Sequence, residues 1–299
     1  MLRRYLSALF AAAAVTAAVV PPAQAGTSGT LFGALVAPKH GEGFANAVNR
    51  QDAAYGRMPI SRVFYGGAVQ QWPGNAGLSG RPVVVSFKYA PSEVLLGIDD
   101  SALSSFFAGA PTGYDVYWSY IHEPEDNIGR GEFTAAEYRA AWQHIADLAS
   151  AAKNTRLHST LILMCYTMNP ASHRNWKDYY VASAQSLLAF DCYNHAGKQN
   201  TYGAPADIFK PVTDWSAANV GIPWGITEVG STLSTNDTNG DQRATWLRQV
   251  GAFLANQRLA HGYAAIFGIY FDTVGPSGTD YRLTDAASRT AWADVVQTF

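Results

Sequence analysis

Two short segments of the sequence end an apolar, strand-like run with a carboxylate: residues 120–125 (YIHEPE) and 225–230 (GITEVG). Glu123 and Glu228 lie far apart in the chain, so they meet only if the fold returns both strand ends to the same rim. A pair of carboxyl groups is what cleavage of a glycosidic bond requires, one as nucleophile or base and the other as general acid. The spacing therefore favours carboxylate chemistry if the fold brings the pair together.

The residues around Glu123 favour the role of general acid. His122 precedes it and is placed to hydrogen-bond within a site, and Pro124 stops the strand. We expect the aromatic rings of Trp118 and Tyr120 to surround the acid and raise its pKa, as proton donation at neutral pH requires.

The residues around Glu228 favour the role of nucleophile. Small residues, Gly225 and Gly230, stand on either side of it and would permit close approach of a substrate. A carboxylate must stay ionised to attack, and nearby hydrogen-bond donors keep it so. Tyr193 is the candidate donor, and Asp191, two residues earlier on the same strand, shares its face.

Other candidate substrate-binding residues are aromatic or charged. Trp118, Trp176 and Trp224 are of the type that stacks on sugar rings, although such residues also fill ordinary cores. Lys88 follows a strand-like run, where an unpaired charge needs water, a partner or a substrate.

A repeating pattern of strands and helices indicates what positions these residues. Strand-like runs cover residues 31–38, 60–65, 82–87, 116–121, 159–166, 187–193, 224–229 and 264–271. Helical patterns fall between them at 43–54, 91–107, 134–153, 174–182, 206–218, 242–257 and 285–296. Eight alternations predict a single-domain α/β protein, a (β/α)₈ TIM barrel, in which Glu123 ends the fourth strand and Glu228 the seventh. A doubly wound open sheet is the main alternative, but it usually carries a Gly-rich phosphate turn after an early strand.

The N-terminus predicts export. Residues 1–25 combine two arginines, an apolar run and a small-residue end, which is typical of a signal peptide cleaved after Ala25. The mature chain would be residues 26–299, a secreted protein with one catalytic barrel. In an oxidising compartment Cys165 and Cys192 either form one disulfide or remain two buried thiols, and the sequence leaves both options open.

Composition and motifs exclude several function classes. A formal net charge of −2 disfavours binding to nucleic acid or to a membrane surface and suits a neutral partner. With the two glutamates in mind, we expect a carbohydrate partner, and we also expect no cofactor and a monomer. No Gly-x-Ser-x-Gly turn is present for a serine hydrolase, and neither cysteine begins a predicted helix.

Two further alternatives remain open. The chain could be a carbohydrate-binding barrel that has lost turnover. It could also be a metal-dependent hydrolase using His122, Glu125 and Asp126, although no second His or Cys group matches that cluster, and we expect no metal.

The motifs resemble a known clan of retaining glycosidases, (β/α)₈ barrels with an acid/base glutamate after strand 4 and a nucleophile glutamate after strand 7. Within that clan the His-Glu pair is similar to glycoside hydrolase family 26, the β-mannanase type. The resemblance implies that Glu123 is the acid/base, Glu228 the nucleophile, His122 a substrate contact, and Tyr193 the tyrosine that hydrogen-bonds the nucleophile. It also implies action on a β-mannan-like polysaccharide.

Overall fold

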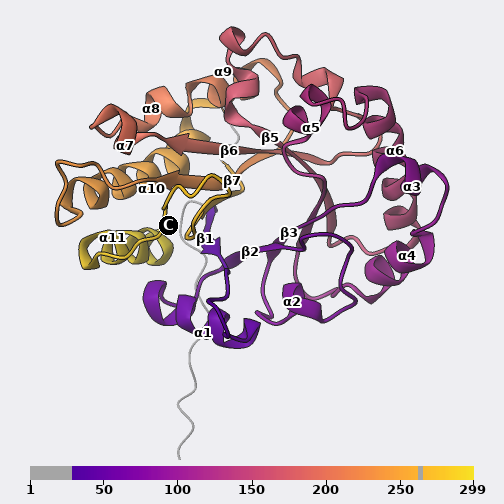
Figure 1. The fold of residues 1–299 in the computed structure, drawn as a ribbon, viewed down its shortest axis with the longest axis horizontal. Helices are drawn as coiled ribbons and strands as arrows, with labels where there is room; N and C mark the ends of the chain where they lie inside the picture. Colours follow the sequence, from indigo (N-terminus) through magenta and orange to yellow (C-terminus); the bar gives the residue numbers. More distant parts are fainter. Residues whose placement is uncertain (1–28, 262–264) are drawn as a thin grey trace, which may run out of the picture.

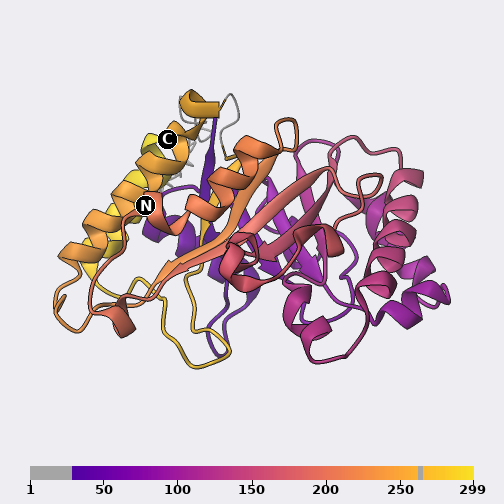
Figure 2. The same ribbon diagram turned by 90° about the horizontal axis from the view of Figure 1, so that it is seen from above.

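The chain forms a closed barrel of eight parallel strands in sequence order, with helices around it (Figures 1 and 2). The computed structural model describes residues 29–261 and 265–299. The strands are β1 (Leu31–Leu35), β2 (Ile60–Phe64), β3 (Val83–Phe87), β4 (Val116–Tyr120), β5 (Leu157–Met164), β6 (Leu187–Asn194), β7 (Trp224–Ser231) and β8 (Phe267–Tyr270). Because β8 pairs with β1, the predicted single-domain (β/α)₈ barrel is confirmed. The predicted signal peptide, and residue 264 of the predicted eighth strand, lie outside the described residues.

Most of the predicted helices are present, and three of the predictions differ in detail. The helices are α1 (Phe44–Tyr55), α2 (Gly74–Gly77), α3 (Pro91–Leu95), α4 (Asp100–Gly109), α5 (Pro124–Gly129), α6 (Ala135–Ala151), α7 (Ala196–Gln199), α8 (Pro205–Ile208), α9 (Lys210–Ala218), α10 (Asp241–His261) and α11 (Ala286–Thr298). The short helices α2, α5 and α7 were not predicted. The helix predicted at 91–107 is divided where Gly97 adopts a φ of 70°. The one predicted at 206–218 is divided at Phe209, and Pro211 lies in the first turn of α9. The segment 174–182 holds only a short 3₁₀ turn, Trp176–Asp178.

Helix α6 shows why the sequence specifies its start so clearly. The Thr134 side chain accepts a hydrogen bond from the Glu137 backbone N–H, and the Glu137 carboxylate accepts one from the Thr134 backbone N–H. This capping box satisfies two amide donors that a helix start leaves unpaired. Helix α6 then buries Tyr138, Trp142 and Ile145 against the barrel. Among the described residues, no helix is both long and apolar enough to span a membrane.

Alternation along the strands separates two apolar layers. The side chains of one layer face the barrel interior: Ile60, Val84, Tyr117, Ile162, Leu187, Ala189, Phe267 and Ile269. The other, larger layer lies between the strands and the surrounding helices and contains most of the buried aromatic rings. Toward the C-terminal strand ends the interior turns polar, with Arg62, Ser86, Ser119, Asp191 and Thr227 all buried. This polar layer is the floor of the site.

A disulfide joins Cys165 to Cys192, which settles the alternative that the sequence left open. It ties the start of the loop after β5 to β6, one residue before Tyr193. The 27-residue separation of the two cysteines predicts a stabilisation of about 3.5 kcal/mol from the restricted unfolded chain.

Reduction of the disulfide should therefore lower the midpoint of urea unfolding. The free energy of unfolding is measured for the wild type with and without dithiothreitol, and for a Cys165→Ala, Cys192→Ala double variant as the control. The variant should be insensitive to the reductant. Equal midpoints for the oxidised and reduced wild type would contradict the stabilising role.

Candidate active site

Glu123 and Glu228 line one cavity of about 680 Å³, the catalytic cavity. Tyr193, His122 and Lys88 line the same cavity. These residues come from the C-terminal ends of β3, β4, β6 and β7, the end at which barrel enzymes place their sites. The structure thus brings together five of the residues that the sequence singled out.

A bulge in β7 turns Glu228 into the barrel. The register between β6 and β7 shifts at this point, so that Phe190 pairs with Ile226 but Asp191 pairs with Glu228, leaving Thr227 as an extra residue. Strict alternation from the outward-facing Ile226 would point Glu228 outward, into the layer beneath the helices. The inserted residue re-aims the carboxylate, which is a common use of bulges beside active sites.

The glycines that flank Glu228 make room for protein rings. A Cβ on Gly225 would lie 2.5 Å from the Phe267 ring, and one on Gly230 would lie 3.0 Å from Tyr281 and 3.1 Å from Tyr193. Gly230 therefore lets the Tyr193 ring pack beside the strand that carries the nucleophile candidate. The expectation that these glycines admit the substrate is corrected accordingly.

Left-handed backbone at the end of β4 sets the direction of Glu123. Ile121 has a φ of 42° and Glu123 a φ of 51°, and both are unusual for residues with a side chain. Hydrogen bonds hold the strained segment, from Ile121 N–H to the Phe87 carbonyl and from Glu123 N–H to the Ile162 carbonyl. Pro124 then starts α5, as its rigid ring suggests. Such strain is typical of functional sites.

The Glu228 carboxylate is buried between one cation and one hydroxyl donor. The Tyr193 O–H donates a short hydrogen bond to Oε2, and Arg62 Nη2 lies 3.8 Å from Oε1. Burial raises the pKa of Glu228, while the Arg62 charge and the Tyr193 hydrogen bond act to lower it. These two groups favour the ionised form that a nucleophile needs.

Arg62 is a site residue that the sequence analysis missed. It is fully buried on β2, with its guanidinium 4.1 Å from the centre of the Phe64 ring. A charged residue inside a predicted buried strand is costly unless it has a partner, and that was the available signal. Its partner, Glu228, lies on β7, five strands later in the chain, so the local sequence around either residue does not reveal the pair.

The Glu123 carboxyl is set up to hold a proton. Burial raises its pKa to about 8, and the charges of Glu228, Glu125 and Asp126 add to the rise. The predicted cause was different, because Trp118 and Tyr120 were expected to surround the acid. Both rings pack in the outer layer instead, against Trp142 of α6.

His122 is held as a neutral ring in the cavity wall. It packs against Phe64 with the ring centres 5.0 Å apart, and burial lowers the pKa of His122 well below its usual range. Among the described residues its buried Nδ1 has no hydrogen-bond partner. Because Nδ1 is buried, a hydrogen bond from this ring to a bound molecule would have to use the other ring nitrogen, Nε2.

Asp191 lies below the catalytic cavity, within the polar layer. It is 4 % exposed, and the Thr227 hydroxyl donates a 2.5 Å hydrogen bond to its Oδ1. Burial raises the pKa of Asp191 well above its usual range, and the charges of Glu228 and Glu123 add to this. Asp191 is the Cα partner of Glu228 on the neighbouring strand and does not line the cavity.

None of the three tryptophans predicted to bind substrate lines the catalytic cavity, so that prediction is corrected. Trp118 and Trp224 are each 1 % exposed and belong to the outer apolar layer, because their positions alternate outward on β4 and β7. Trp176 packs edge-on against Trp215 and lines a separate cavity of about 740 Å³ near α9.

The side chains proposed for a metal site point in different directions. The Glu125 carboxylate accepts hydrogen bonds from Met164 N–H (2.9 Å) and the Thr167 hydroxyl (2.6 Å), whereas His122 packs on Phe64. Asp126 is paired with Arg174 at 3.1 Å. Over residues 29–261 and 265–299, no group of three His, Cys, Asp or Glu side chains is arranged to hold a metal ion.

Solved structures of glycoside hydrolases share this fold. The GH26 domain of an endo-β-mannanase/endo-β-glucanase from Prevotella bryantii is 12% identical, with a TM-score of 0.55 and coverage of 89% of this chain and 88% of that one. A glucosidase from Croceicoccus marinus is 11% identical, with a TM-score of 0.60 and coverage of 90% of this chain and 67% of that one. A GH128 endo-β-1,3-glucanase from Amycolatopsis mediterranei is 14% identical, with a TM-score of 0.54 and coverage of 89% of this chain and 99% of that one. No protein-family model and no curated protein matches the sequence. The chain is therefore similar to these glycosidase barrels in fold.

Proposed function

We propose that the protein is a retaining β-glycoside hydrolase that uses Glu228 as nucleophile and Glu123 as acid/base. The observation that carries this proposal is the difference in neighbours between two carboxyls in one cavity. Burial raises the pKa of both, but Glu228 faces Arg62 and the Tyr193 hydroxyl, which act to lower its pKa, whereas nearby carboxylates add to the rise for Glu123, to about 8. Carboxyl pairs with opposed environments are typical of acid and base assignments.

The two residues account for both steps of a double displacement. Glu123 donates its proton to the leaving glycosidic oxygen while Glu228 attacks the anomeric carbon and forms a glycosyl ester. Water then attacks that carbon, Glu123 takes the proton of the water, and the Glu228 carboxylate is released. The Tyr193 hydroxyl and Arg62 hold the carboxylate before and after the ester forms.

The pH dependence follows from the state of Glu123. Because Glu123 must enter the reaction protonated, kcat/KM should fall as pH rises through about 8. Since Glu123 and Glu228 interact, each limb of the pH profile belongs to the pair. The profile of initial rates against pH checks this, and a rate already falling between pH 5 and 6 would contradict the assignment of the acid.

We propose an exported enzyme acting within a polysaccharide, with a β-mannan-like chain as the first candidate. The His-Glu motif and the fold shared with a GH26 domain support the family 26 assignment. Export rests on residues 1–25. Endo action is supported by two further cavities that share lining residues with the catalytic cavity, one at the loops after β3 and β4 and the other at the loops after β1 and β8.

A panel of β-mannans, β-glucans and β-xylans tests the proposal. The purified protein should release oligosaccharides from at least one of them, identified by mass spectrometry. Binding of a glycan with no hydrolysis over days would contradict enzymatic function and favour the non-catalytic barrel. Activity lost in a chelator would instead favour the metal-dependent alternative.

A further inference from the structure

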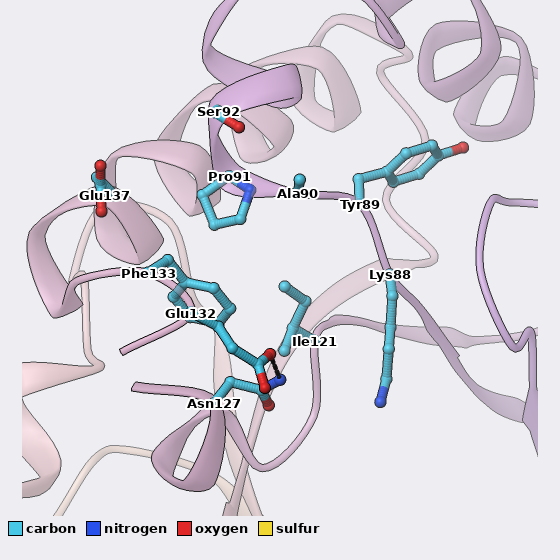
Figure 3. A pocket seen from close by; sticks show the side chains of 10 residues that line it. All are labelled: Lys88, Tyr89, Ala90, Pro91, Ser92, Ile121, Asn127, Glu132, Phe133 and Glu137. Carbon is cyan, nitrogen blue, oxygen red and sulfur yellow. Dashed lines mark hydrogen bonds between the residues drawn. The ribbon is translucent and has the colours of Figure 1, made fainter. Parts of the chain in front are cut away.

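Two further cavities share lining residues with the catalytic cavity, at different loops of the barrel. One, of about 340 Å³, shares Lys88 with it and lies at the loops after β3 and β4; we call it the β4-side cavity (Figure 3). The other, of about 470 Å³, lies at the loops after β1 and β8 and is called the β8-side cavity. It shares Ala37, Pro38, Thr273 and Val274 with the catalytic cavity. A glycan long enough to occupy all three would cross the scissile position.

The β8-side cavity is lined by cations. Its charged lining residues are Lys39, Arg50, Arg282 and Arg289 against one carboxylate, Asp272. That carboxylate is already occupied by its neighbours. Its Oδ2 accepts hydrogen bonds from Gln51 and Tyr55, and its Oδ1 accepts one from the Leu283 backbone N–H.

The cations keep unused donors. Arg50 pairs with Glu42, and Arg282 pairs with Asp280, but neither acid lines the cavity. Counting those two acids and Asp272 against the four cations, the cluster still carries a net charge of +1, on a chain whose formal net charge is −2. Within the described part of the chain, no hydrogen bond or ion pair reaches the Lys39 ammonium.

The catalytic cavity continues this positive charge. With Glu123 protonated and Glu228 balanced by Arg62, the remaining fixed charge on its lining is that of Lys88. In the described residues the Lys88 ammonium has no hydrogen bond or ion pair. Figure 3 shows its side chain extending away from Ser92 and Glu137.

The β4-side cavity lacks this excess of positive charge. Apart from Lys88 its charged lining residues are Glu132 and Glu137, and Pro91, Ile121 and Phe133 give it an apolar wall. Glu132 is paired with Arg130 at 2.6 Å, so the two acids and the two cations of this region sum to zero. The excess positive charge therefore lies at the β8-side cavity and not at the β4-side cavity.

From this distribution of charge we propose that the β8-side cavity is a subsite for an anionic sugar, so that the glycan carries a uronic acid or a sulfate ester on one fixed side of the cleaved bond. This rests on the proposed glycosidase function and narrows its substrate. A neutral mannan chain would leave the net positive charge of this cluster, and the Lys39 ammonium in particular, without a counterpart. Arginine side chains in particular suit carboxylate and sulfate groups.

The test compares three forms of a glycan that the wild type cleaves: neutral, partly oxidised to uronic acid at C6, and sulfated to the same degree. At low salt kcat/KM should be higher for an anionic form, and the advantage should shrink from 20 to 300 mM NaCl. Sequenced products should carry the anionic residue on the same side of every cleaved bond. The two anionic forms separate carboxylate from sulfate recognition.

Single variants locate the effect. Lys39→Ala and Arg282→Gln should each lower the ratio of anionic to neutral kcat/KM about fivefold. Both side chains are exposed, so folding should be unaffected. Lys153→Ala is the matched control, because Lys153 lies beside the N-terminal end of β5 and should leave the ratio unchanged.

The outcomes separate this inference from the proposed function. Equal or lower kcat/KM on both anionic forms, with normal cleavage of the neutral form, would overturn the subsite and leave the glycosidase standing. If no glycan is cleaved, calorimetric binding of the neutral and anionic oligosaccharides decides the matter. Equal affinities for the neutral and the anionic oligosaccharides would then overturn the proposed subsite as well.

Discussion

Replacing Glu228 by Gln should lower turnover of the cleaved glycan by at least about 10⁴-fold while leaving the fold intact. The amide keeps the shape of the side chain and still accepts the Tyr193 hydrogen bond, but it does not attack the anomeric carbon. Loss of the charge relieves repulsion with Glu123 and Asp191 but leaves the buried Arg62 guanidinium without its ion-pair partner. We therefore expect a lower midpoint of thermal unfolding than that of the wild type, with the folded state still formed at the assay temperature.

Glu93→Gln is the control for this variant. Glu93 is exposed on α3, outside the catalytic cavity, and its replacement should leave kcat and KM unchanged. A Glu228→Gln enzyme that keeps more than a tenth of wild-type turnover on every cleaved glycan would remove Glu228 from the mechanism.

Replacing Glu123 by Gln should have an effect that depends on the leaving group. With a glycan, whose leaving oxygen needs a proton, the rate of bond cleavage should fall by about 10²- to 10⁴-fold. With a dinitrophenyl glycoside, whose leaving group departs as an anion, formation of the glycosyl ester should fall far less. Stopped-flow release of the phenol measures that step separately from the slower hydrolysis.

The same variant should lose the basic limb of the pH profile, because the group whose pKa is raised to about 8 has been removed. Glu125→Gln is the informative comparison, since Glu125 is the neighbouring carboxyl and binds Met164 and Thr167 instead of lining the cavity. If Glu125→Gln, and not Glu123→Gln, showed the leaving-group dependence, the acid would be assigned to the wrong residue.

The barrel and the positions of its strands were predictable because they follow from local patterns. Apolar runs, most of them rich in Val, Ile, Tyr and Phe, mark the strands, and the Thr134 and Glu137 pair marks the start of α6. The placement of Glu123 and Glu228 at strand ends required only the count of strands and the rule that sites lie at the C-terminal ends.

The interior of the site was less predictable, because it depends on register and on contacts between distant strands. The inserted Thr227 in β7 becomes visible only when β6 and β7 are paired, and it decides which way Glu228 points. Arg62 and Glu228 come from different strands and meet inside the barrel, so the residues next to either one in the sequence do not predict the ion pair. Trp118 and Trp224 could not be placed from the sequence for the same reason. Successive side chains on a strand face opposite layers, and both rings face the outer layer and not the site.

The most direct test of the central claim is the configuration of the first product. Proton NMR, recorded within minutes of adding enzyme to the cleaved β-glycan, shows which anomer of the reducing sugar appears before mutarotation. Attack by Glu228 followed by attack of water predicts the β-anomer first. Initial release of the α-anomer would mean single displacement by water, and it would contradict Glu228 as the nucleophile.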